Sequence, residues 1–93
     1  LKMANVQPGD AIYVLGLGAI GMLITHLGVQ RGLRVFVGDL NPILMEKAND
    51  FGAEQGDWKQ EDIRVVFECT GSAAATTQLC TDAPRGSKII LLG

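Results

Sequence analysis

The sequence predicts a single α/β domain in which a parallel sheet of four to five strands is doubly wound by helices. Strand-like apolar runs alternate with helix-like segments along the 93 residues. The first run, AIYVL, is apolar throughout, which is typical of a strand buried on both faces of a parallel sheet. A glycine-rich turn follows it and leads directly into a helix, as in a βα unit of such a sheet.

Composition limits the class of protein. With 47% hydrophobic residues and a net charge of −2, the chain is expected to fold as one domain with a modest core. Lys and Arg are scattered singly, so no nucleic-acid partner is expected. No run approaches the ~20 apolar residues of a membrane span, and no signal-peptide core opens the chain. Cys69 and Cys80 form no C-x-x-C and are expected to be reduced, in a cytoplasmic protein.

The glycine turn carries the first functional signal. Gly16, Gly18 and Gly21 have the spacing G-x-G-x-x-G between a strand and a helix. Gly16 would allow the tight turn, Gly18 would let a pyrophosphate approach the backbone, and Gly21 would let the helix pack closely on the strand. The N–H groups of the first helical turn, residues 19–21, would face the anion. The alternative interpretation is a strand-to-helix turn that is merely rich in glycine.

The helix after the glycines is predicted from about Ala19 to Arg31, with Gly32 as its C-terminal glycine. Apolar residues at i, i+3, i+4 and i+7 indicate one apolar face, formed by Ile20, Leu23, Ile24 and Leu27. His26 lies away from that face. Because it is the only histidine in the chain, it is expected at the surface or at an interface and not in a metal site.

An acidic residue follows the second predicted strand, RVFVG, residues 34–38. Asp39 lies 18 residues after Gly21, close to the ~20 typical of the carboxylate that binds the adenosine ribose of a dinucleotide. A carboxylate favours a free 2′-hydroxyl and repels a 2′-phosphate, and residues 40–42 supply no Arg, so NAD is expected and not NADP. The alternative is that Asp39 only caps a turn, but the glycine spacing favours the ribose role.

The second helix is predicted to start with Asn41 as N-cap and Pro42 in the first turn, and to end at Gly52. Its apolar stripe contains Met45, Ala48 and Phe51. Leu44 departs from that stripe and is expected near the adenosine end of a cofactor.

The third strand is predicted to be short and polar, over residues 54–57. Residues 58–62 must then cross to the fourth strand, IRVVFE at 63–68. Five residues span at most ~18 Å, too little for the usual crossover helix. We therefore expect coil with at most one helical turn.

The remaining elements complete the sheet. A βα turn at 70–72 has Ser72 as N-cap, a helix is expected over 73–83, and the last strand, SKIILLG, covers 87–93. Right-handed crossovers give the strand order (3)-2-1-4-5. A ligand is expected at the carboxyl ends of the strands, where four residues converge: Gly16, Asp39, Thr70 and Leu92.

Four segments, in order, resemble the nucleotide-binding domain of zinc-type medium-chain alcohol and polyol dehydrogenases: QPGD-x-IYVLGLGAIGML, VGDLNP-x-x-x-x-KA-x-x-FGA, V-x-FECTG and SKIILLG. The resemblance covers almost the whole chain. It implies a Rossmann-like fold, NAD(H) as cofactor and the oxidation of an alcohol or polyol to a carbonyl compound. It assigns the pyrophosphate to Gly16, Gly18, Ala19, Ile20 and Gly21, the adenosine ribose to Asp39, the adenine side to Thr70 and Gly71, and the nicotinamide to Leu92.

The chain departs from the family pattern in three places. Leu44 stands where the family commonly has a Lys or Arg that helps to hold the adenosine. The stretch 58–62 has no room for the helix between the third and fourth strands. The zinc-binding catalytic domain is absent, because the chain has no cluster of Cys, His and Glu ligands, and Cys69 in FECTG is not expected to bind zinc. We therefore expect residues 1–93 to be a dinucleotide-binding fragment of a larger two-domain protein, with no catalytic residue and no metal site of its own.

Two other functions are open. A non-catalytic NAD(H)-sensing module shares the glycine turn and the acid, and an S-adenosylmethionine methyltransferase also pairs a glycine loop with an acid after the second strand. The PGD, FECTG and ILLG segments favour the dehydrogenase. As its fragment, the chain is expected to bind NAD(H) weakly and to turn nothing over, with the missing catalytic domain as its partner. Its last strand, at a sheet edge, is expected to be open to homo-oligomer formation.

Overall fold

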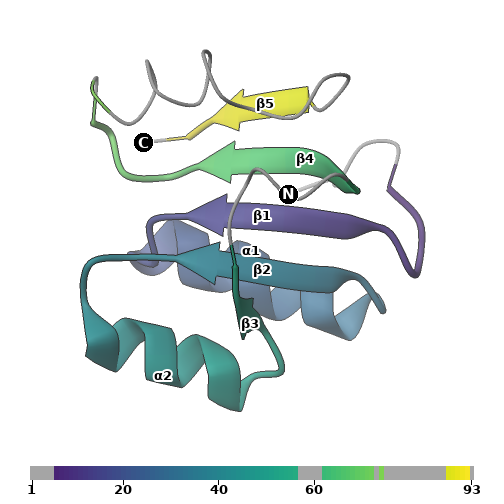
Figure 1. Cartoon of the computed structure of the whole chain (residues 1–93), viewed down its shortest axis with the longest axis horizontal. Coiled ribbons are helices and arrows are strands. Elements are labelled where there is room, and N and C mark those ends of the chain that lie inside the picture. The colour runs from purple at the N-terminus through teal and green to yellow at the C-terminus, as the bar shows by residue number, and fades with distance from the viewer. Residues whose placement is uncertain (1–5, 57–61, 73, 75–87, 93) are drawn as a thin grey trace.

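The computed structural model describes residues 6–56, 62–72, 74 and 88–92. Five strands and two helices occur in this part of the chain (Figure 1). Their bounds are β1 Ala11–Leu15, α1 Ala19–Gln30, β2 Arg34–Gly38, α2 Pro42–Asp50, β3 Glu54–Gln55, β4 Ile63–Glu68 and β5 Lys88–Leu91. The strands form one sheet in the order β3-β2-β1-β4-β5, and every pair is parallel. The predicted fold class and strand order are thus confirmed.

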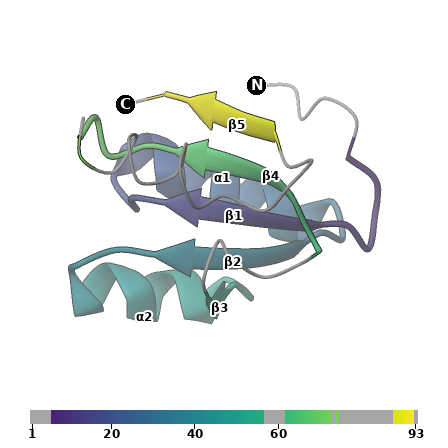
Figure 2. The same ribbon diagram turned by 45° about the horizontal axis from the view of Figure 1, so that its top comes forward.

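The carboxyl ends of the central strands lie level with one another. Leu15 of β1 pairs with Gly38 of β2 on one side and with Glu68 of β4 on the other, and Glu68 pairs in turn with Leu91 of β5. The ladder extends one step further, because Gly16 N–H donates to the Gly38 carbonyl oxygen at 2.8 Å. The turns that follow these strands therefore start from one edge of the sheet (Figures 1 and 2).

The core has two parts, one on each face of the sheet. On one face, β-branched and aromatic strand residues pack with Ile24 of α1 and Ala48 of α2, so both helices cover that face. On the other face a smaller buried cluster contains Ala11, Tyr13, Ile63 and Val66. The predicted helix 73–83 lies outside the described residues apart from Ala74.

Helix α1 faces the sheet with a different side from the one predicted. Ile20 and Leu23 are 50% and 52% exposed, so only part of the predicted apolar face is buried. The side in contact with the sheet contains Gly21, Ile24, Thr25 and Gly28. A Cβ at Gly28 would lie 2.9 Å from Val35 Cγ2, which shows how closely the helix approaches β2. The short distance between α1 and the sheet is therefore set by small residues and not by the bulkiest apolar ones.

The start of the second βα unit agrees with the prediction, whereas Phe51 of the predicted apolar stripe is 43% exposed. The Asn41 side chain caps α2 by accepting from Ile43 N–H at 2.9 Å, and Pro42 is the first helical residue. His26 is exposed and its ring meets that of Phe51 edge to face, 5.3 Å between centroids, so it joins the two helices at the surface. β3 is two residues long, shorter than predicted, and the coil predicted for 58–62 lies outside the described residues except for Asp62.

Candidate functional site

A cavity of about 670 Å³ lies at the carboxyl edge of the sheet. The cavity opens at the carboxyl end of β1, which has β2 on one side and β4 on the other. Ligands of open parallel α/β sheets bind at such a point. The cavity is lined by Tyr13, Leu15, Gly16, Gly18, Gly38, Asp39, Leu40, Leu44, Cys69, Thr70 and Ser72.

Two glycines of the turn are required by packing. Gly16 has φ +94°, and a Cβ there would lie 2.8 Å from Thr70 Cγ2, so it allows both the turn and the close approach of the loop after β4. A Cβ at Gly21 would lie 1.8 Å from the Gly16 carbonyl oxygen, so α1 packs directly against the turn.

Gly18 is different, because a Cβ there would meet no atom within 4 Å. Its φ is −66°, which any residue adopts, so neither packing nor backbone conformation among the described residues requires glycine here. The open space lies in the cavity wall, where a ligand can reach the backbone.

The start of α1 presents N–H groups for which no acceptor is found among the described residues. The first i→i−4 bond of the helix runs from Met22 N–H to the Gly18 carbonyl oxygen at 2.9 Å. The N–H groups of Ala19, Ile20 and Gly21 precede it, and Gly18 as N-cap supplies no side-chain acceptor. With no acidic residue in the first turn, this helix end is suited to an anion supplied by a ligand.

Asp39 lies half-buried across the cavity from Thr70. Its Oδ2 accepts from Leu17 N–H at 2.6 Å, and its Oδ1 accepts from Asn41 N–H at 2.8 Å. The capping role considered from the sequence is therefore observed. Each carboxylate oxygen can accept a second hydrogen bond, so this arrangement leaves acceptor capacity for ligand hydroxyls.

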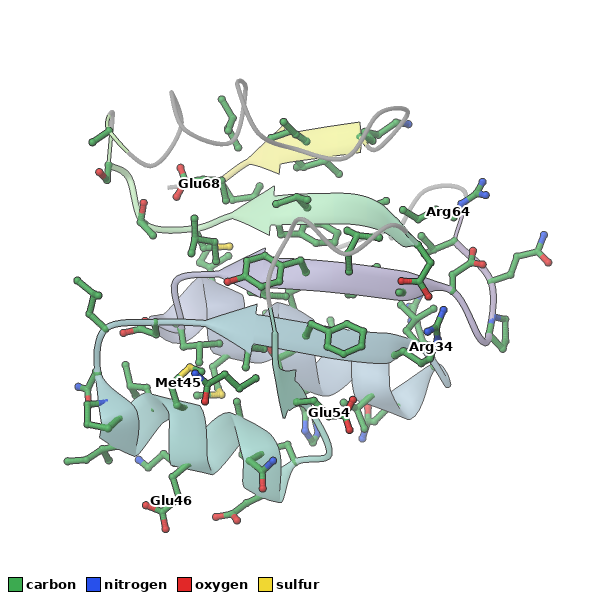
Figure 3. All side chains as sticks on the ribbon, in the orientation of Figure 1. Arg34, Met45, Glu46, Glu54, Arg64 and Glu68 are labelled. Carbon is green, nitrogen blue, oxygen red and sulfur yellow. The ribbon has the colours of Figure 1, made fainter. Side chains whose placement is uncertain are left out.

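The opposite wall follows β4 and rests on a buried carboxylate. Glu68 is 2% exposed, and its Oε1 accepts from Thr70 N–H at 2.6 Å and from the Thr70 hydroxyl. Figure 3 shows Glu68 at the carboxyl end of β4. Thr70 Oγ1 in turn accepts from Ser72 N–H at 2.9 Å. Burial, together with the nearby Glu68 charge, raises the pKa of the Cys69 thiol to about 11.

Tyr13 and Gly38 fit together at the base of the cavity. Tyr13 is 2% exposed, and a Cβ at Gly38 would lie 1.9 Å from its hydroxyl oxygen. The aromatic ring therefore occupies the space that a side chain at position 38 would need.

The structure brings together part of the predicted site. Gly16, Gly18, Asp39 and Thr70 line the cavity, as does Leu44. Five predicted residues do not line it: Ala19, Ile20, Gly21, Gly71 and Leu92. Leu92 N–H instead donates to the Glu68 carbonyl oxygen at 2.8 Å.

Sequence reasoning missed Tyr13, Gly38 and Glu68 as parts of the site. The signal for Glu68 was an acid at the end of an apolar strand, the same signal that identified Asp39. In the part of the chain that the structure describes, no group of three or more His, Cys, Asp or Glu side chains could hold a metal ion. No helix among those residues is long and apolar enough to cross a membrane.

Known proteins similar to this chain include several dehydrogenases. It is 32% identical to the S-(hydroxymethyl)glutathione dehydrogenase of Haemophilus influenzae over 97% of this chain. It is 45% identical to the enzyme of that name from Escherichia coli O1:K1 over 89%. The chain spans about 28% of the length of such relatives: 28% of the Haemophilus protein and 27% of the other. No protein-family model matches it.

Solved structures agree with the fold. The alcohol dehydrogenase TADH from Thermus sp. ATN1 superposes with a TM-score of 0.80 at 22% identity, covering 95% of this chain and 30% of that one. A zinc-binding dehydrogenase, described as putative, from Sinorhizobium meliloti 1021, bound to NADP, gives 0.79 at 25% identity, covering 96% and 31%.

Proposed function

Because this chain resembles, over almost its whole length, the nucleotide-binding domain of zinc-type medium-chain alcohol and polyol dehydrogenases, we propose that it is the NAD(H)-binding part of such an enzyme. The oxidation of an alcohol or polyol to a carbonyl compound is proposed for the whole protein only. The chain covers less than a third of the length of its relatives, so a zinc-bearing catalytic domain is proposed as its missing partner.

The observation that carries the proposal is the position of Asp39 beside the open glycine turn, in the wall of the same cavity. The carboxylate stands at the end of β2 with acceptor capacity left, and the space at Gly18 is clear. The N–H groups of residues 19–21 have no acceptor in the described structure and suit a pyrophosphate. A dinucleotide needs these three features together: acceptors for ribose hydroxyls, donors for phosphates and room at the backbone.

NAD(H) is proposed over NADP(H) on the charge of the cavity. None of the described residues that line it is Lys or Arg, and Asp39 would repel a 2′-phosphate. Arg34 and Arg64 lie at the opposite end of the sheet (Figure 3). The Sinorhizobium protein is bound to NADP, so the preference proposed here rests on the residues of this chain alone.

When bound, the nicotinamide cofactor supplies a hydride acceptor or donor. The chain's own residues bind and orient it: the glycine turn with Ala19 and Ile20 at the pyrophosphate, and Asp39 at the adenosine ribose. Thr70 and Gly71 are proposed beside the adenine and Leu92 toward the nicotinamide, following the family pattern. None of these residues is assigned a proton-transfer or metal-binding role, so the chain is expected to bind the cofactor without turning over an alcohol.

Calorimetric titration of the purified chain with NAD⁺ and NADP⁺ tests the proposal. We expect saturable NAD⁺ binding, tighter than NADP⁺ binding. In Asp39→Ala, NAD⁺ binding should weaken by about tenfold or more, as expected for the loss of hydrogen bonds to a charged group. The matched control is Glu46→Ala, which removes an exposed carboxylate that points away from the sheet (Figure 3). Tighter binding of NADP⁺ than of NAD⁺ by the unmodified chain would overturn the assignment of Asp39, and alcohol oxidation by the chain alone would overturn its role as a binding domain only.

A further inference from the structure

The carboxylate of Asp39 joins two turns that are far apart in the sequence. Its Oδ2 accepts from Leu17 N–H, in the middle of the glycine turn, and its Oδ1 accepts from Asn41 N–H, at the start of α2. The bond to Leu17 is the shorter, 2.6 Å against 2.8 Å, and spans 22 residues. Asn41 then caps α2 through its own side chain. One side chain therefore fixes the exits of β1 and β2 relative to each other.

Leu17 has a particular need for this acceptor. The residue is 1% exposed and packs in the main core cluster, so water has little access to it. Its two neighbours are glycines, which restrict the backbone least of all residues. A partly buried N–H without an acceptor is costly, so the turn would rearrange if the carboxylate were removed.

We propose that Asp39 is a positioning residue of the glycine turn: it holds the backbone at Leu17 so that the turn is already in its binding conformation before a ligand arrives. This role deepens the proposed function, on which its consequence for nucleotide binding rests, but the hydrogen bond itself exists without nucleotide. Asp39 thus acts twice, once on the ribose through its remaining lone pairs and once on the phosphate-binding turn through Leu17.

The double role restricts how cofactor preference can change. Replacing an acid at this position by a small residue would remove the repulsion of a 2′-phosphate. In this chain the same change would also release the turn that both NAD⁺ and NADP⁺ need. Asparagine keeps one carbonyl oxygen for Leu17 N–H while removing the charge, so Asp39→Asn and Asp39→Ala separate the two roles.

Amide hydrogen exchange on the ligand-free chain tests the positioning role directly. In Asp39→Ala, the Leu17 N–H should exchange about tenfold faster or more, as expected for the loss of a bond to a charged acceptor. The Gly16 N–H, which donates to Gly38, serves as the reference within the same molecule. Unchanged Leu17 exchange in a folded Asp39→Ala chain would overturn the proposal. Should that variant not fold, through-hydrogen-bond scalar coupling between Leu17 N and Asp39 Cγ in the wild-type chain decides: its presence supports the bond and its absence overturns it.

Binding of inorganic pyrophosphate, which has no ribose, gives a second test, because the two roles predict opposite changes in its affinity for Asp39→Ala. Removing a negative charge favours an anion, so a ribose-only role for Asp39 predicts tighter pyrophosphate binding in both variants. The positioning role predicts weaker binding in Asp39→Ala and binding at least as tight as wild type in Asp39→Asn. Tighter binding in both variants would overturn it. If wild type binds neither pyrophosphate nor NAD⁺, the proposed function fails, while the exchange of Leu17 still decides the positioning role.

Discussion

The two walls of the cavity are built differently. The wall formed by Gly16, Gly18 and Asp39 consists of backbone and one half-exposed carboxylate. The wall after β4 is held by Glu68, whose side chain is buried. This residue is 2% exposed and accepts two hydrogen bonds from Thr70. In the first wall the acid faces the cavity and has acceptor capacity left for a ligand, whereas in the second it is buried and serves the protein. Two acids at the carboxyl ends of strands in one sheet therefore have different functions, set by burial.

The largest effect is expected at the glycine turn, where Gly18 lies in the first wall and Gly21 lies behind it, in contact with the turn. Gly21→Ala should strongly destabilise the fold, by about 3 kcal/mol or more, because its Cβ would lie 1.8 Å from the Gly16 carbonyl oxygen. Gly18→Ala is the matched control: it should leave the melting temperature near that of wild type but weaken NAD⁺ binding, since the methyl group fills open space. Circular-dichroism melting and calorimetry measure the two effects. A Gly21→Ala chain as stable as wild type would contradict the close packing of α1 on the turn.

The second wall should be chemically inert despite its cysteine. A pKa near 11, against the ordinary thiol value of 9.0, lowers the thiolate fraction of Cys69 about a hundredfold at pH 8. Its alkylation by iodoacetamide should therefore be slow at pH 8 and rise steeply toward pH 11. The rate is measured in a Cys80→Ser background, with the unfolded chain in urea as the reference. Equal rates in the folded and unfolded chains would show that the wall does not shield the thiol.

Glu68→Gln removes the charge of the second wall and keeps its size. Because hydrogen bonds to a charged acceptor are stronger than those to an amide oxygen, we expect a loss of about 2 kcal/mol in the free energy of unfolding. The pKa of Cys69 should fall at the same time, since the Glu68 charge helps to raise it. Urea denaturation measures the first effect and alkylation the second. The control, Glu54→Gln, changes an exposed carboxylate on β3 and should alter neither.

Thr70→Val gives the smallest expected change. It removes the hydroxyl that donates to Glu68 and accepts from Ser72 N–H, while the Thr70 N–H bond to Glu68 persists. A loss of about 1 kcal/mol in the free energy of unfolding is expected by urea denaturation. If Thr70→Val costs more than Glu68→Gln, the hydroxyl and not the buried carboxylate organises this wall.

The difference between the walls also explains what the sequence could predict. The strand order and Asp39 followed from short-range patterns: apolar runs, glycine spacing and an acid at a set distance. Glu68 also follows an apolar run, but its role depends on burial beside β1 and β5, which only the assembled sheet reveals. The exposure of Ile20 and Leu23 escaped prediction for a related reason. Periodicity identifies the apolar face of a helix, but close packing through Gly21 and Gly28 decides which side touches the sheet.

The fit of Tyr13 over Gly38 has a consequence for the evolution of the domain. The two positions lie on neighbouring strands, and a side chain at 38 would overlap the Tyr13 hydroxyl. Position 38 therefore cannot change freely while Tyr13 is present: a larger residue at 38 becomes acceptable only after Tyr13 has been replaced by a shorter one. Among homologous chains we expect covariation between these positions, with the order of substitution fixed because the reverse order passes through a steric clash.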